Sequence, residues 1–138
     1  MDLDAAFPAT SEPLGELPLC HARLQADARY AWIVLVPRVE GARELEDLAE
    51  PDRAQLMAEI VLAGRAVRAV GEALGRSVEK LNVGALGNVV PQLHVHVVGR
   101  RRDDPAWPGP VWGQGVADAY APERLARALS AARFALGL

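Results

Sequence analysis

One stretch of the sequence alternates between polar and apolar side chains and carries two of the three histidines of the chain: Pro91-Gln92-Leu93-His94-Val95-His96-Val97-Val98-Gly99. A period of two is typical of a half-buried β-strand, because successive side chains point to opposite faces of the sheet. The pattern therefore predicts a strand in which His94 and His96 lie side by side on one face, while branched aliphatic residues pack on the other. Pro91 is compatible with this strand because it opens it, where no ladder donor is lost.

The segment before this strand is a glycine-containing turn, Gly84-Ala85-Leu86-Gly87-Asn88. Glycine lets the backbone approach a ligand closely, and exposed main-chain N–H groups in such a turn can bind an anion. A single histidine in a strand is about as often a structural residue as a functional one. Two imidazoles on one face, directly after such a turn, favour a functional site, and phosphate is the ligand that we expect there.

A His-x-His strand can also bind zinc, which needs three or four protein ligands in total. The other nitrogen and sulfur ligands are Cys20 and His21, which are adjacent and would point to opposite faces of a strand. At most one of them could easily join the pair, and no carboxylate cluster lies near the motif. We therefore predict no metal cofactor, and a metal-binding strand protein is one alternative interpretation.

The stretch from Gln92 to Val98 resembles the signature of the histidine triad (HIT) family, His-φ-His-φ-His-φ-φ with φ apolar, but has glutamine in place of the first histidine. Two upstream segments are also similar to family motifs: the turn within Asn82–Val90 and the strand Trp32–Arg38. A bacterial subgroup shares the Gln-φ-His-φ-His variant and a Trp-Pro-Gly-Pro-Val-Trp-Gly segment, which here spans residues 107–113.

The resemblance implies an α+β domain with the histidine triad fold: a mainly antiparallel sheet of about five strands, a long helix and a C-terminal helix. It also implies a homodimer in which the sheet extends across the interface. In the family the C-terminal segment reaches towards the partner's site. We therefore expect residues 103–138 to lie at the dimer interface, beside a motif core at residues 82–102.

For the motif residues the resemblance implies separate catalytic roles. His94 matches the family's nucleophile, which attacks the α-phosphate of a nucleotide and forms a nucleotidyl-histidine intermediate that water resolves. His96 matches a residue that contacts the phosphate. Gln92 occupies the auxiliary place of the first histidine, where an amide can form hydrogen bonds but cannot carry a proton as imidazole does. Free imidazole, with a pKa near ~6.5, is largely uncharged at neutral pH and is a good nucleophile towards phosphorus.

The resemblance also implies a phosphate site and a nucleoside site. Gly87 and Asn88 are expected to bind phosphate, and Asn88 keeps an amide where the family has glutamine. Val89 replaces the serine or threonine whose hydroxyl helps to hold the bridging atom of the leaving group, so leaving-group preference or rate should differ. Asp27 and Asn82 are expected to bind the nucleoside, although an Asp in a turn is structural at least as often.

Together these roles predict a nucleotide-binding hydrolase or nucleotidyl transferase that acts at the α-phosphate of a nucleoside phosphoramidate, a dinucleoside polyphosphate or a related conjugate. The main alternative is a nucleotide-binding protein with little or no turnover, because the hydroxyl at Val89 and the first histidine are both missing. That protein would bind AMP but form no product that depends on His94.

Length and composition set the remaining expectations. A chain of 138 residues, of which 51% are hydrophobic, predicts a single domain over residues 1–138. The net charge of −3 argues against a nucleic-acid partner. One cysteine, an acidic N-terminus and no apolar run of membrane-spanning length predict a cytoplasmic protein without membrane contact.

Hydrophobic periodicity predicts strands at residues 17–25, 30–36, 78–83 and 91–99, with the first two forming a hairpin, and helices at residues 51–74 and 122–136. Residues 1–16 contain Pro8, Pro13 and Gly15 and predict a surface loop or a short helical turn. Residues 106–115 are rich in proline, tryptophan and glycine. Their aromatic side chains must pack on the domain, on a base or in a dimer interface, and we expect the interface.

Overall fold

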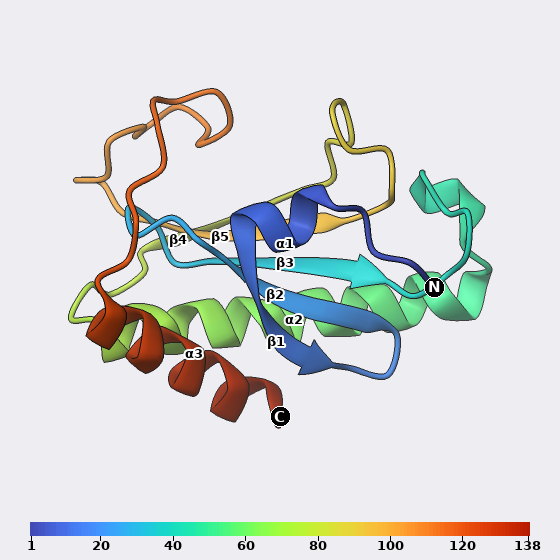
Figure 1. Ribbon diagram of the computed structural model, residues 1–138, viewed down its shortest axis with the longest axis horizontal. Coiled ribbons are helices and arrows are strands. Elements are labelled where there is room, and N and C mark those ends of the chain that lie inside the picture. Colours follow the sequence, from blue (N-terminus) through green and yellow to red (C-terminus); the bar gives the residue numbers. More distant parts are fainter.

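A computed structural model describes all residues, 1–138. Its centre is one antiparallel sheet of five strands in the order β1-β2-β3-β5-β4 (Figure 1). The strands are β1 Ser11–Glu16, β2 Cys20–Gln25, β3 Trp32–Pro37, β4 Lys80–Gly84 and β5 Val95–Arg100. The helices are α1 Ala6–Thr10, the 3₁₀ turn η1 Leu45–Asp47, α2 Glu50–Ala73 and α3 Pro122–Leu136. The predicted α+β class, with a long helix and a C-terminal helix, is confirmed.

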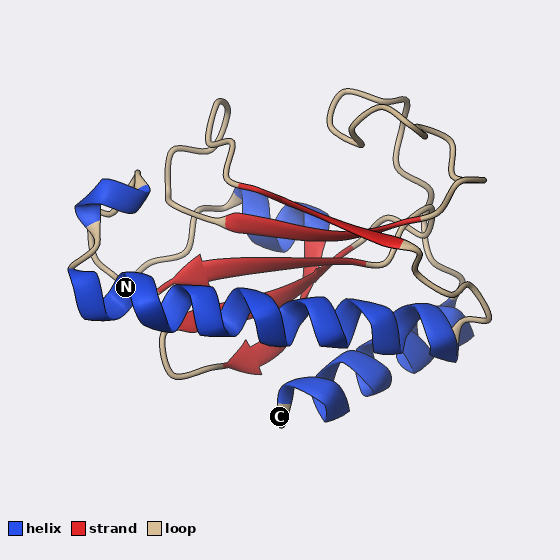
Figure 2. Ribbon diagram, turned by 180° about the vertical axis from the view of Figure 1, so that it is seen from behind, coloured by secondary structure: helices blue, strands red, loops and turns tan.

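The two long helices cover one face of the sheet. Figure 2 shows α2 and α3 together in front of the strands, and Figure 1 shows α1 on the opposite side. The main core lies beneath α2 and α3 and includes alternate residues of the central strands, such as Leu24, Ile33, Leu35 and Val97. β3 is buried along its whole length because both of its faces are covered. None of the helices is long and apolar enough to cross a membrane.

A second, smaller cluster lies on the other face of the sheet, away from α2 and α3. It contains aromatic and β-branched residues of α1, the turn before β3, β3, β5 and the loop after β5: Phe7, Tyr30, Trp32, Val34, Val36, Val98 and Val111. The loop over residues 101–121 contributes Val111 to this cluster, and Ala106 and Trp112 of the same loop pack against it. Aromatic side chains therefore cover this face of the sheet, and part of the loop after β5 lies over them. His94 and His96 project towards the same face.

The expectation of an irregular residue range 1–16 is wrong in its second half, because residues 11–16 form β1 and pair with β2. The register shifts between Pro13 and Gly15, as a bulged edge strand allows. Pro13 and Gly15 are typical of turns, so the local pattern did not predict this strand. Its pairing with β2 stabilises it. The motif strand is also shorter than predicted, because β5 begins at Val95 and residues 91–94 lie in the loop that leads into it.

Candidate functional site

His94 and His96 lie side by side where β5 enters the sheet. His96 pairs with Val34 of β3 and Gly84 of β4, so its side chain shares the face of the small aromatic cluster. His94 precedes β5 on the same side, and the two rings meet edge to face with their centroids 4.9 Å apart. The predicted pairing of two imidazoles on one face is what the structure shows. His94 is only 7% exposed, so its ring orientation is held by its surroundings.

The hydrogen bond of His94 determines which ring nitrogen is free. Nδ1 lies 2.7 Å from the main-chain oxygen of Gln92. A carbonyl oxygen can only accept, so Nδ1 must carry the proton and donate it. In the uncharged ring Nε2 then keeps its lone pair. The geometry leaves His94 with one available nucleophilic atom, and that atom is Nε2.

His96 has the opposite tautomer. The indole N–H of Trp32 donates to Nδ1 of His96 at 3.0 Å, so Nδ1 is the acceptor and Nε2 carries the proton of the uncharged ring. Burial, and in second place the neighbouring His94, lower the pKa of His96 from 6.5 to about 4. His96 is therefore uncharged at neutral pH. Its Nε2–H makes no hydrogen bond within the protein and is available to a ligand oxygen.

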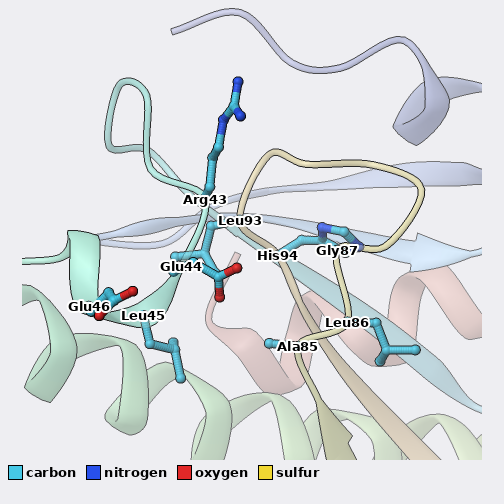
Figure 3. Close-up of a pocket in the computed structure, with 9 residues that line it drawn as sticks. All are labelled: Arg43, Glu44, Leu45, Glu46, Ala85, Leu86, Gly87, Leu93 and His94. Atoms are coloured by element: carbon cyan, nitrogen blue, oxygen red, sulfur yellow. The ribbon is translucent and has the colours of Figure 1, made fainter.

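Two cavities meet at His94, separated by the loop that joins β4 to β5. The first has a volume of about 280 Å³ and is lined by Arg43, Glu44, Leu45, Glu46, Ala85, Leu86, Gly87, Leu93 and His94. In Figure 3 the Glu44 carboxylate turns towards the space beside Leu93, whereas the Arg43 guanidinium extends away from it. The second has a volume of about 290 Å³ and is lined by Leu86, Gly87, Asn88, Val89, Val90, His94, His96 and Trp112.

The loop between β4 and β5 lines both cavities and carries main-chain donors that have no partner within the protein. Gly87 has a φ of +67°, which turns the chain back beside the His94 ring. The amide groups of residues 87–90 donate no hydrogen bond within the protein. Unpaired, exposed N–H groups beside two imidazoles form the kind of concavity that binds an anion. Asn88 lines the second cavity, and Val89 is 93% exposed at its edge.

The side chain of Gln92 points away from both cavities. Its Oε1 accepts a hydrogen bond from the main-chain N–H of Asp4 at 2.8 Å, and its Nε2 donates to the main-chain oxygen of Asp2 at 3.1 Å. Gln92 touches His94 only through its own main-chain oxygen. The sequence motif places this residue in the site, but the structure directs its amide to the N-terminal segment.

Asp27 and Asn82, the expected nucleoside ligands, line neither cavity at His94. Asp27 is 2% exposed, and its carboxylate accepts hydrogen bonds from the Arg29 side chain and the main-chain N–H of Asp118. The oxygen of the Asn82 side chain accepts from Arg100 at 2.7 Å. Both groups have partners within the protein, and a nucleoside role for either stays a prediction.

Three aromatic residues complete the site, and one of them, Phe7, lies outside every motif segment of the sequence. Phe7 of α1 meets the His94 ring edge to face at 5.0 Å. Trp32 holds His96 by the hydrogen bond described above. Trp112 contacts His96 at 5.5 Å, and its buried indole N–H has no partner within the protein. Because β3 pairs with β5, Trp32 lies on the same face as Val34 and hence as His96.

The site holds no third metal ligand. The structure contains no group of three or more His, Cys, Asp or Glu side chains that could hold a metal ion. Cys20 is fully buried in the core beneath the helices. His21 lies on the opposite side of β2 and bonds to Glu16 and Arg23. Neither residue approaches the pair, so nothing in the geometry favours the metal-binding interpretation.

Comparisons with known proteins find the same fold in solved structures. The HIT domain family model matches residues 8–103. The chain is similar to a histidine triad protein from Bradyrhizobium japonicum, with 40% identity, a TM-score of 0.91 and coverage of 98% of this chain and 97% of that chain. A histidine triad protein from Sinorhizobium meliloti has 40% identity, a TM-score of 0.88 and coverage of 98% and 96%. One from Marinobacter aquaeolei has 38% identity, a TM-score of 0.88 and coverage of 99% and 96%. No functionally curated protein is similar enough to match.

Proposed function

Because the chain belongs to the histidine triad family, a family of nucleotide hydrolases and nucleotidyl transferases, we propose that it cleaves nucleotide conjugates at the α-phosphate through His94. The observation that carries the proposal is the hydrogen bond from His94 Nδ1 to the main-chain oxygen of Gln92. It leaves the lone pair on Nε2, beside free main-chain N–H groups and at the meeting point of two cavities. A nucleophile for phosphorus requires that arrangement.

In the first step the Nε2 lone pair of His94 attacks the α-phosphorus. A bond forms between nitrogen and phosphorus, the bond to the leaving group breaks, and its electron pair departs with that group. A polyphosphate leaves as an anion, whereas an amine takes a proton from water. In the second step water attacks the phosphorus, the bond to Nε2 breaks, and the nucleotide is released with the proton passing to solvent. An acceptor other than water makes the same chemistry a transfer.

The negative charge that builds up on the phosphate oxygens needs hydrogen-bond donors that are already in place. The Nε2–H of His96 and the free amides of residues 87–90 are such donors. The main-chain amides of Gly87 and Asn88 are in this group, so we assign both residues to the phosphate. The donors are uncharged, so the site stabilises the transition state by oriented dipoles.

The two cavities suit the two halves of a conjugate. Most of the surface of the second is apolar and Trp112 lines it, so it suits the nucleoside. The first is lined by Glu44 and Glu46, while the Arg43 guanidinium extends away from it (Figure 3), and it suits a polar leaving group such as an amine. Nucleoside phosphoramidates match this division, and dinucleoside polyphosphates are the second substrate class to test.

AMP release from adenosine phosphoramidate and from diadenosine polyphosphates tests the proposal. Wild-type protein should release AMP and form a nucleotidyl adduct that mass spectrometry places on residue 94. His94→Ala should abolish both. His21→Ala is the matched control, since His21 lies on β2 outside the site, and it should retain activity. Equal activity of wild type and His94→Ala would exclude His94 as the nucleophile.

Nucleotide binding without turnover is the second candidate, and Val89 is the observation that favours it. This side chain stands where the family has a hydroxyl, and it extends into solvent at the edge of the second cavity. Calorimetry would then detect AMP binding to wild type and to His94→Ala alike, with no adduct in either. Adduct formation by the wild type would contradict this candidate.

We also infer that the protein is a homodimer, as the family resemblance implies. β4 is an edge strand of the sheet and has no partner on its outer side within the protomer. Beside it, Val83 of β4 and Met57 and Val61 of α2 are each at least half exposed. A second copy that continued the sheet at β4 would cover this apolar surface. A contribution of residues 103–138 to that interface stays a prediction.

A further inference from the structure

Gln92 links the motif to the N-terminus of the chain. Its side-chain amide spans the main chain of residues 2–4, accepting from the N–H of Asp4 and donating to the oxygen of Asp2. Both polar atoms of the amide are thereby used, one as acceptor and one as donor. The contact joins segments that are 88 and 90 residues apart in sequence, so it is a tertiary contact that no local propensity explains.

The segment held by Gln92 begins α1. Asp4 accepts hydrogen bonds from Ala6 at 2.9 Å and from Phe7 at 3.1 Å, so the position of Asp4 determines where this short helix starts. α1 has only five residues and is too short to be stable by itself. Its place on the sheet therefore depends on contacts such as the one to Gln92.

α1 brings Phe7 against the His94 ring. Phe7 is 5% exposed and packs edge to face on His94, with a centroid separation of 5.0 Å. His94 is thus held on three sides: by His96, by Phe7 and by the main-chain oxygen of Gln92. Gln92 contributes to two of these contacts, directly through its carbonyl group and indirectly through α1.

We propose that Gln92 is a positioning residue whose side chain anchors the N-terminal segment, so that Phe7 holds the His94 ring with Nε2 directed at the phosphate. The proposal rests on the proposed role of His94 as the nucleophile. It assigns no proton transfer and no substrate contact to the Gln92 side chain. It also explains why an amide suits this position, because a donor and an acceptor at one tip match the Asp2 oxygen and the Asp4 N–H.

The isosteric variant Gln92→Glu tests the donor half of the contact. Its carboxylate can still accept from the Asp4 N–H, but it faces the Asp2 oxygen without a hydrogen to donate. We expect kcat to fall about tenfold or more while KM stays within about twofold, because a slightly displaced nucleophile affects the reaction more than binding. A rise in KM at unchanged kcat would instead mean that the side chain binds substrate, and would overturn the proposal.

Two further variants separate positioning from general loss of stability. Gln55 also forms a side-chain hydrogen bond, to Glu59 at 2.7 Å, but lies on α2 outside the site. Gln55→Glu should lower the melting temperature without changing kcat. Phe7→Leu should lower kcat as Gln92→Glu does, and the double variant should be no slower than the slower single variant, because both act on one contact chain. If the two substitutions lowered kcat by factors that multiply in the double variant, Gln92 would not act on His94 through Phe7.

NMR of the substrate-free protein keeps this test independent of the proposed function. The ring nitrogen shifts of His94 report its tautomer and its contacts. We expect these shifts to change in Gln92→Glu and Phe7→Leu but not in Gln55→Glu. Unchanged His94 shifts in Gln92→Glu would overturn the positioning role. Changed shifts in a protein whose wild type forms no adduct would support the contact chain and reject the nucleophile.

Discussion

His96 illustrates how burial changes the chemistry of a single residue. Burial first, and His94 second, hold its pKa at about 4, so the ring stays uncharged and acts as a hydrogen-bond donor. The Trp32 N–H favours the same state, because it needs an acceptor at Nδ1. A protonated His96 would lose this bond and bring a charge next to His94. The site is therefore built for an uncharged donor.

The lowered pKa of His96 predicts a loss of stability in acid. Unfolded chain, with the usual value of 6.5, binds the proton more readily than folded protein does. The part of the free energy of unfolding that depends on an uncharged His96 is therefore fully present above pH 6.5. It decreases as the pH is lowered and is lost below about pH 4. The full change is about 3 kcal/mol. Urea unfolding of wild type and His96→Gln at several pH values should show a flatter profile for the variant, and parallel profiles would contradict the assignment.

Val89 predicts a gain of activity from a single added hydroxyl. The side chain is 93% exposed at the second cavity, so a substitution there has little effect on folding. Val89→Ser restores the group that the family uses at the bridging atom, and we expect AMP release from diadenosine polyphosphates to rise about tenfold. Val89→Ala is the control, since it removes the same methyl groups without adding a hydroxyl. Equal rates for the two variants would show that the hydroxyl has no role here.

Among the elements, the loop over residues 101–121 depends on one buried ion pair. Arg100 and Asp104 form two hydrogen bonds, at 2.8 and 3.0 Å, with both side chains 2% exposed. Asp104 also accepts from the main-chain N–H of Trp107, and Arg100 donates to Asn82 of β4. This network ties the start of the loop to β4 and β5. The rest of the loop brings Trp112 over the second cavity.

Asp104→Ala should lower the free energy of unfolding by about 3–5 kcal/mol, because it leaves the Arg100 charge buried without a partner. Chemical denaturation measures this change. The tryptophan fluorescence of the folded protein should shift as well, since Trp107 and Trp112 follow in the same loop. Asp103→Ala is the matched control: Asp103 pairs with Arg101 on the surface, and its loss should have little effect. Similar losses in both variants would argue against a special role for the buried pair.

At the scale of the whole molecule, the exposed apolar residues beside β4 predict an interface with a second copy of the chain. Met57 and Val61 are 60% and 50% exposed and precede Gly64 on the same side of α2. Gly64 packs so closely on β4 that an added Cβ would lie 2.9 Å from Leu81 Cδ1. Val83 is 52% exposed on the same edge. Exposed apolar residues of α2 and of the edge strand thus lie on the side of the protomer where Gly64 packs on β4.

The surface predicts that the wild type is a dimer in solution and that Val61→Lys shifts it to monomer, because a charge would be buried between the copies. Light scattering after size exclusion measures the mass. Phe134→Lys is the comparison, since Phe134 is 88% exposed on α3. Dissociation of that variant would place the C-terminal helix in the interface. A monomeric wild type would contradict both expectations.

Local patterns were sufficient for the elements that are regular and for the pair of imidazoles. The period-two alternation around His94 and His96 determined their common face, and the spacing of apolar residues located α2 and α3 to within one residue at each end. The same patterns missed β1, because Pro13 and Gly15 are typical of turns and only the pairing with β2 makes the segment a strand.

The sequence by itself therefore determined the family, the fold class and the residue that we propose as nucleophile, because these depend on periodicity and on a short contiguous motif. Only the tertiary structure decided what surrounds that residue. The Nδ1–H tautomer of His94, the neutral state of His96 and the direction of the Gln92 amide each depend on a partner far away in sequence or on the path of the folded backbone. Contacts of Phe7, Trp32 and Asp4 form when distant segments meet, and no local pattern encodes such a meeting.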